Sequence, residues 1–189
     1  GIHGFRQLTG CKDIFYSTAL AVEEALLSGK PLFGCSMDFA KAFDLVPRER
    51  IFELGKKAGM PDRILGPLQA MYSQLQRRFR IGAMVGEAFT TTNGILQGCP
   101  ISVCMLNLLM HVWTSAVTRE CPGVTARAYA DDASSRTEQV SDICDVFSLT
   151  KEFSTLTGMR LNTKKCLAWA ITTDARRRLQ HCLEAILSR

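Results

Sequence analysis

Apolar residues recur at helical spacing along much of the chain, and shorter apolar runs separate these stretches. The spacing predicts helices over residues 13–27, 47–58, 61–75, 101–118 and 140–156, with a basic helix beginning at Asp174. Short, mostly apolar runs predict buried strands over residues 32–37, 124–129 and 167–171. Residues 77–92 alternate around a central Gly86, which predicts a hairpin.

The order of these elements determines the fold class that we expect. Strands, helices and a hairpin follow one another without an internal repeat or a low-complexity linker, and 189 residues suffice for one domain. The sequence therefore predicts an α+β fold, with an antiparallel-rich sheet backed by helices. The apolar face of the 101–118 helix is expected in the core.

Composition and charge narrow the class of protein. With 47% hydrophobic and 22% charged residues, the chain is neither disordered nor fibrous. The net charge of +5 permits a polyanionic partner but does not require one. No uninterrupted apolar run approaches the roughly 18 residues of a spanning helix, so we expect no membrane segment. The opening Gly1-Ile2-His3-Gly4 lacks an initiator Met and a signal peptide, and we expect a piece of a longer protein.

The eight cysteines form no CxxC pair, and no histidine lies beside them at a zinc-ligand spacing. Their neighbours are mostly apolar. We therefore expect reduced, buried cysteines that act as small hydrophobic residues, and a disulfide framework is the weaker interpretation.

Three aspartates follow predicted strands. Asp38 ends the 32–37 run, and Asp131 and Asp132 follow the 124–129 run. Carboxylates at buried strand ends are costly without a cation, so two such ends side by side indicate a site for divalent metal, with two ions roughly 4 Å apart for phosphoryl transfer. Ordinary turn aspartates explain the same spacing. The residues alone leave both interpretations open: a metal-dependent phosphotransferase, or aspartates that only form turns.

The flanking residues carry a family resemblance. Tyr129-Ala130-Asp131-Asp132 resembles the YxDD box of reverse transcriptases. Residues 36–47 (SMDFAKAFDLVP) resemble the family's first catalytic strand, and residues 93–102 (NGILQGCPIS) its QGxPxS segment. Residues 157–166 (TGMRLNTKKC) and 3–6 (HGFR) are similar to two further motifs. The five motifs occur in the family's order, in a style similar to non-LTR (LINE-type) retrotransposons and group II intron maturases.

This resemblance implies a polymerase right-hand palm with part of the fingers. Residues 1–30 would be a fingers remnant, 31–172 the palm, and 173–189 a helix that starts the segment beyond it. The implied activity is RNA-directed DNA polymerase, a nucleotidyltransferase that adds dNTPs to a DNA primer 3′-OH on an RNA template, within a retroelement polyprotein. The life cycle of the family implies an intracellular location, cytoplasmic or nuclear. Asp38, Asp131, Asp132 and the backbone carbonyl of Phe39 would hold two Mg²⁺ ions, or Mn²⁺ in their place.

The resemblance also implies roles around the nucleotide. Phe43 would exclude a 2′-OH by bulk, Gln97 and Gly98 would contact the incoming nucleotide, and Arg6 would meet its triphosphate. Lys165 would protonate the leaving pyrophosphate, with Lys164 as an adjacent competitor. Each has a plain structural alternative: a core phenylalanine, a turn glycine, or a solvated basic residue.

Clustered Arg77, Arg78 and Arg80 suit template or primer phosphates, or form a solvated face. The polar residues 133–138 depart from the family's apolar return strand, which predicts an exposed edge strand or a decaying element. An inactive relic that at most binds RNA is therefore the alternative function. An RNA-dependent RNA polymerase is disfavoured by Phe43 and by the YADD form.

Overall fold

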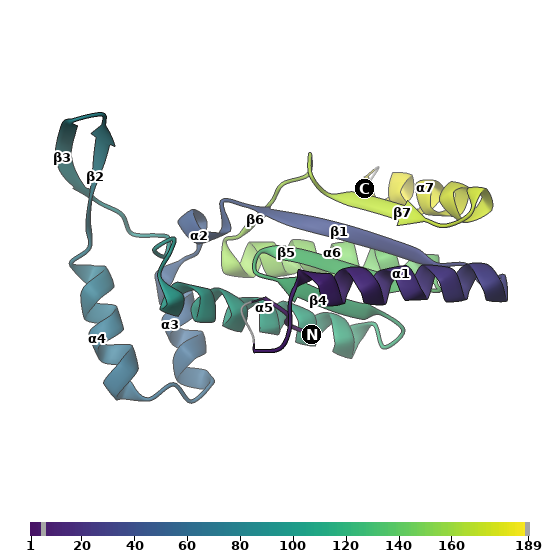
Figure 1. The fold of residues 1–189 in the computed structure, drawn as a ribbon, viewed down its shortest axis with the longest axis horizontal. Coiled ribbons are helices and arrows are strands. Elements are labelled where there is room, and N and C mark those ends of the chain that lie inside the picture. Colours follow the sequence, from purple (N-terminus) through teal and green to yellow (C-terminus); the bar gives the residue numbers. More distant parts are fainter. Residues whose placement is uncertain (5–6, 188–189) are drawn as a thin grey trace.

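A five-stranded antiparallel sheet forms the centre of the molecule (Figure 1), for which the computed structural model describes residues 1–4 and 7–187. The strands run in the order β4-β5-β1-β6, and β7 also pairs with β1. Their bounds are β1 (Phe33–Ala40), β4 (Thr125–Tyr129), β5 (Asp132–Thr137), β6 (Arg160–Leu161) and β7 (Leu167–Ala170). The N-terminal residues run beside β4, where Ile2 forms a parallel bridge with Ala128.

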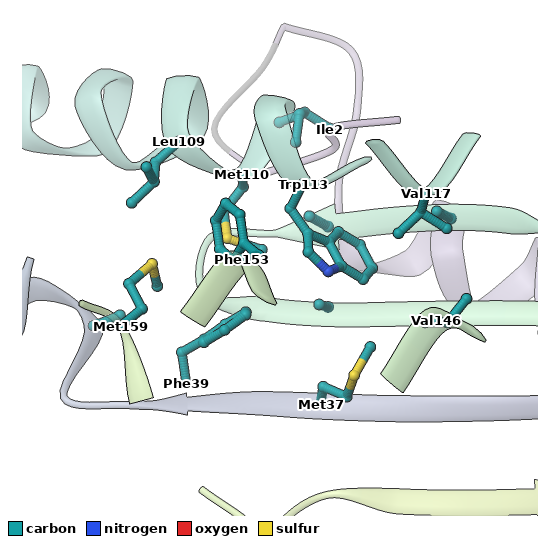
Figure 2. Packing of buried hydrophobic residues seen from close by; sticks show 14 of the residues in the cluster. Ile2, Met37, Phe39, Leu109, Met110, Trp113, Val117, Val146, Phe153 and Met159 are labelled. Carbon is teal, nitrogen blue, oxygen red and sulfur yellow. The ribbon is translucent and has the colours of Figure 1, made fainter. Parts of the chain in front are cut away.

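Two helices, α5 (Pro100–Glu120) and α6 (Val140–Thr157), contribute the apolar side chains that pack on one face of this sheet (Figure 2). Alternate residues of β1 point into this core, and Phe39 meets Phe153 of α6 edge to face, with ring centroids 5.9 Å apart. Trp113 of α5 is fully buried and donates its indole N–H to Thr150 Oγ1 at 3.0 Å. Burial of each such large side chain contributes about 2–3 kcal/mol.

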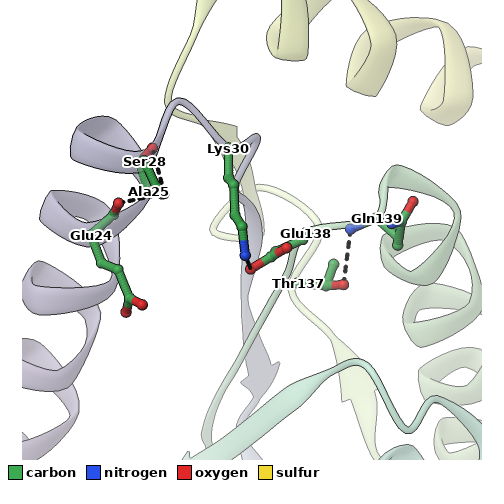
Figure 3. A network of polar contacts seen from close by, with 7 residues as sticks. All are labelled: Glu24, Ala25, Ser28, Lys30, Thr137, Glu138 and Gln139. Carbon is green, nitrogen blue, oxygen red and sulfur yellow. Dashed lines mark hydrogen bonds and ion pairs between the residues drawn. The ribbon is translucent and has the colours of Figure 1, made fainter.

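The opposite face of the sheet is partly covered by α1 (Cys11–Ser28), which ends at Gly29 with φ +68°. Arg136 of β5 donates to the Ser17 carbonyl of α1 at 3.0 Å. Where α1 and β5 end, Lys30 and Glu138 form an exposed ion pair at 3.6 Å (Figure 3). The last helix, α7 (Thr173–Leu187), lies beside β7 and α6.

A second part of the molecule, which we call the arm, projects from one end of the sheet (Figure 1). It consists of α3 (Arg48–Lys57), α4 (Asp62–Ser73) and the hairpin β2 (Gln76–Ile81) and β3 (Met84–Thr90), and the short α2 (Ala42–Leu45) joins it to β1. The hairpin carries no fully buried residue.

The predicted helices and strands are confirmed, with differences at particular residues. The hairpin turns at Gly82 (φ +61°) rather than at Gly86, which lies inside β3. The first strand continues past Asp38 to Ala40 because β6, which was not predicted, pairs with its last residues.

The expectation that residues 133–138 form an exposed edge strand is wrong. β5 lies between β4 and β1 and pairs with both. Backbone pairing on both sides keeps this polar strand in the interior, and Thr137 is buried and donates to Asp142 Oδ2 at 2.6 Å.

The cysteine expectation is also partly wrong, because Cys144 and Cys182 form a disulfide that joins α6 to α7. A pairing between two separate helices leaves no spacing signal in the sequence. Cys11 and Cys104 are exposed, whereas Cys35 is buried and desolvation raises its thiol pKa to about 12.

By length and composition alone, α5 would suffice to cross a membrane, although polar residues interrupt its apolar sequence. Its largest apolar residues, among them Met110 and Trp113, are buried in the core with the sheet. Packing in the core therefore accounts for its apolar composition.

Candidate active site

Two of the predicted aspartates face each other across the sheet. Asp38 of β1 and Asp132 of β5 form the last pair of their antiparallel ladder. Directly opposed residues have Cβ atoms roughly 5 Å apart on one face. Asp131 lies in the two-residue loop between β4 and β5, next to Asp132. The strand pairing thus places Asp38 and Asp132 at one end of the sheet, on the face opposite the core, and Asp131 follows in the adjoining loop.

Burial and the neighbouring charges shift the pKa of Asp132. Desolvation raises its pKa above the ordinary value, and the negative charges of Asp131 and Asp38 raise it further, while Lys165 lowers it. The Lys165 Nζ lies 3.4 Å from Asp38 Oδ1, with 67% of the lysine side chain exposed against 21% of the aspartate. Three carboxylates with one exposed lysine leave an excess of negative charge that favours a cation.

The donors fit Mg²⁺ when substrate phosphates complete the site. Within residues 1–4 and 7–187, no three acidic, histidine or cysteine side chains are grouped closely enough to hold an ion by themselves. Mg²⁺ in phosphoryl-transfer sites needs only one or two carboxylates together with phosphate oxygens.

The pairing of β1 with β6 determines the direction of the Phe39 carbonyl. Because the Asn162 N–H donates to the Asp38 carbonyl at 2.8 Å, Phe39 and Leu161 form a non-hydrogen-bonded pair. The Phe39 carbonyl therefore points away from β6 and toward the side of β5, where the ladder has already ended.

Strained backbone borders the aspartates on both strands. Ala130 precedes Asp131 at φ +53°, and Lys41 follows β1 at φ +50°, in the left-handed region that favours glycine. Gly4 lies against this turn so closely that a Cβ would come 2.5 Å from the Ala130 nitrogen. The N-terminal motif therefore contacts the YADD turn directly, and only glycine fits there.

A groove of about 630 Å³ brings together three of the predicted nucleotide-binding residues, Phe43, Gln97 and Gly98. Backbone bonds set this arrangement, since Ile95 N–H donates to the Phe43 carbonyl at 2.6 Å. Phe43 is half-buried and packs against the core, so it is both a core residue and a groove wall. Gly98 has φ +84° and open space around it, which explains glycine on conformational grounds.

The remaining predicted site residues, all basic, lie in different environments. Lys165, rather than its exposed neighbour Lys164, reaches Asp38. Arg6 lies outside the described residues. Arg78 and Arg80 are exposed on the hairpin, whereas Arg77 is half-buried, with its Nε shielded and without a hydrogen-bond partner in the described structure.

Sequence reasoning missed Arg48, which is 7% exposed at the start of α3. Its Nε donates to the Gly94 carbonyl at 2.7 Å, and its two Nη atoms donate to the carbonyls of Tyr72, Thr91 and Asn93. Burial lowers its pKa, with the charge of a nearby arginine as a smaller cause. One basic residue in a charged stretch of sequence gives no signal of such a role.

Tyr72 of α4 completes this connection. Its ring lies 5.1 Å beneath the Arg48 guanidinium, and its hydroxyl pairs with Ser102 Oγ at 2.9 Å and accepts the Leu96 N–H at 3.0 Å. Arg48 and Tyr72 therefore position the segment that leads into Gln97. Cys99, which lines the same groove, was missed as well; a hydrogen bond from the Ser102 N–H is the main cause that lowers its thiol pKa.

Comparison with known proteins identifies relatives of this chain. The profile of a family described as "Reverse transcriptase (RNA-dependent DNA polymerase)" matches residues 1–184. The chain is 24% identical over 155 residues to the Pol polyprotein from the type-1 retrotransposable element R2 of Popillia japonica. It is 24% identical over 174 residues to the polyprotein of element R2DM of Drosophila melanogaster. The matches cover 78% and 89% of this chain, but only 26% and 16% of the relatives.

Solved structures share the fold. Telomerase from Candida tropicalis, in complex with the TWJ fragment of telomeric RNA, matches with a TM-score of 0.67 at 13% identity, over 84% of this chain and 29% of that one. The corresponding Candida albicans telomerase gives 0.64 at 11% identity, over 85% of this chain and 30% of that one. The predicted combination of an antiparallel palm sheet, helices and part of the fingers is confirmed by this similarity of fold.

Proposed function

The chain belongs to the reverse transcriptase (RNA-dependent DNA polymerase) family, and from this premise we propose that its protein adds dNTPs to a DNA primer on an RNA template. The matched relatives come from R2 elements, which agrees with the non-LTR style of its motifs. One observation carries the proposal: Asp38 and Asp132 are directly paired beside Asp131. We also propose that it acts inside the cell, as part of a retroelement polyprotein.

Asp38, Asp131, Asp132 and the Phe39 carbonyl would hold two Mg²⁺ ions, or Mn²⁺ in their place. When bound, these ions lower the pKa of the primer 3′-OH and neutralise charge on the triphosphate. The chain's own residues orient the reactants. Lys165, whose Nζ lies 3.4 Å from Asp38 Oδ1, would donate a proton to the leaving pyrophosphate.

The groove would hold the nucleotide. Phe43 would lie under the sugar and exclude a 2′-OH by bulk, while Gln97 and the Cβ-free Gly98 would contact the base and sugar. Arg6 would bind the triphosphate, and the hairpin residues Arg77, Arg78 and Arg80 would bind template phosphates.

One argument for an inactive relic no longer applies. That argument was the polar sequence of residues 133–138, but these residues form β5, an interior strand paired on both sides. All three carboxylates are also present at the site, so an active polymerase is the function that the geometry supports best.

Primer extension on poly(rA)/oligo(dT) with Mg²⁺ or Mn²⁺ tests the proposal, using the full-length protein. Asp131→Asn keeps the side-chain shape and removes the charge, and it should abolish extension. Asp145→Asn on the exposed surface of α6 removes the same charge elsewhere and should leave extension intact. No extension by the folded wild-type protein, or extension that survives Asp131→Asn, would favour the relic.

A further inference from the structure

Two arginines lie together on the sheet face that α1 covers, several residues away from the aspartates. Thr125 pairs with Arg136 and Arg127 with Ser134, so the two guanidinium-bearing residues are diagonal neighbours on adjacent strands. Diagonal neighbours on one face are close enough for long side chains to meet. The strand register thus concentrates two positive charges beneath α1.

Neutral oxygens are the partners of both groups. Arg136 donates to the Ser17 carbonyl and hydroxyl, each at 3.0 Å, and Arg127 reaches the Asp13 carbonyl at 3.4 Å. In the described ranges, neither arginine forms an ion pair with a carboxylate. Burial lowers the pKa of Arg136, and the charge of Arg127 lowers it further. Two half-buried cations without an anion are unfavourable, and a bound anion would relieve both.

A cavity of about 90 Å³ lies between α1 and the sheet at this point. Both arginines line it, together with five hydroxyl-bearing residues: Thr18, Ser36, Thr125, Ser134 and Ser135. Guanidinium groups match the oxygens of phosphate-like anions, and hydroxyls donate to the oxygens that remain. The volume suits one small ion and excludes a nucleotide.

We propose that this cavity binds a small tetrahedral oxyanion of the phosphate or sulfate type. The ion would bind Arg127 and Arg136 of the sheet beneath α1, where Thr18 lines the cavity and its hydroxyl already donates to the Ile14 carbonyl. Because it would bind only the folded chain, it would stabilise the packing of α1 on the sheet. The proposal is independent of the polymerase chemistry, since none of these residues belongs to the aspartate cluster or to the nucleotide groove.

Calorimetric titration of inorganic phosphate into the protein tests this site, at constant ionic strength balanced with chloride. We expect saturable binding at one site. Arg127→Gln should weaken it about tenfold or more, since it removes a charge-assisted contact. Arg127 makes only one long contact with α1, so this variant is expected to fold, and far-UV circular dichroism verifies that.

Two further variants sharpen the result. Ser134→Ala should weaken binding a few-fold, while Arg50→Gln, which removes an exposed arginine from α3, should bind as the wild type does. Absence of saturable binding, or equal affinity of folded Arg127→Gln, would overturn the proposal and leave both arginines as structural contacts to α1. Competition of single-stranded RNA with phosphate would overturn it too, because it would assign the arginines to an open nucleic-acid surface.

Discussion

The sheet and the arm differ in how their side chains are held in place. In the sheet, strand register and a packed core determine where each functional side chain lies, as the pairing of Asp38 with Asp132 illustrates. The hairpin of the arm has no such core: Phe79 is 71% exposed and its main ring partner is Phe89, stacked at 4.8 Å. An isolated two-stranded hairpin is marginally stable in water. The fixed part of the molecule therefore carries the acidic chemistry, and the exposed part carries basic and apolar side chains.

The largest expected effect comes from the sheet. Asp38→Asn should lower the rate of nucleotide addition about a thousandfold or more, equivalent to roughly 4 kcal/mol in the barrier, because the metal-binding charge is lost. Single-turnover primer extension measures this rate. If the variant retains near-normal rates, the chemistry does not reside at the end of β1.

Replacing Arg48, which connects the sheet with the arm, should have the next largest effect, on the stability of the fold. Arg48→Met removes the buried guanidinium and leaves the Gly94, Thr91 and Asn93 carbonyls without their donor. We expect the free energy of unfolding to fall by about 3 kcal/mol in urea denaturation. Arg50→Met, at an exposed position two residues away, should change it by less than about 0.5 kcal/mol. Equal effects of the two variants would contradict the role given to Arg48.

Phe43 lies where the sheet meets the arm, and its removal should change selectivity more than rate. In Phe43→Ala, discrimination of dNTP against rNTP should fall about 10- to 100-fold because the groove no longer excludes the 2′-OH. Competitive incorporation of matched dNTP and rNTP gives this ratio. An unchanged ratio would show that Phe43 serves only the core.

Charge removal from the arm should affect binding and leave chemistry intact. In the double variant Arg78→Gln and Arg80→Gln, the dependence of RNA affinity on salt should weaken, with a slope smaller by about 1.4 for two lost phosphate contacts. Fluorescence anisotropy over a salt series measures the slope. The control variant Arg50→Gln and Arg63→Gln removes two exposed charges from the helices of the same arm. A matching loss in the control would indicate a general charge effect.

The smallest effect is a pH dependence at Asp132. Its pKa in the folded chain lies above the ordinary value of 3.8, so the folded state binds more protons than the unfolded state between these two values. Through that window the free energy of unfolding should fall as pH rises. Asp132→Asn should flatten this segment of the profile, measured by urea denaturation in metal-free buffer. A steeper profile in the variant would contradict the cause assigned to the shift.

The sequence predicted what periodicity and motif order control. Helical spacing located α1, α5 and α6, and apolar runs located β1 and β4. The position of β5 could not be predicted in this way, because polar residues such as Thr137 become interior only through partners elsewhere in the chain. Arg48 stayed hidden for the same reason, since its acceptors are backbone carbonyls distant in sequence.

The N-terminal residues have a consequence for association. The outer edge of β4 would otherwise present unpaired backbone groups, and open edges recruit strands from other chains. His3 N–H donates to the Ala128 carbonyl at 2.8 Å, and Ala128 N–H donates to the Gly1 carbonyl at 3.0 Å. Residues 1–3 thus cover the edge of β4 next to the YADD turn, where a strand of another chain would otherwise pair, and they hold Gly4 against Ala130.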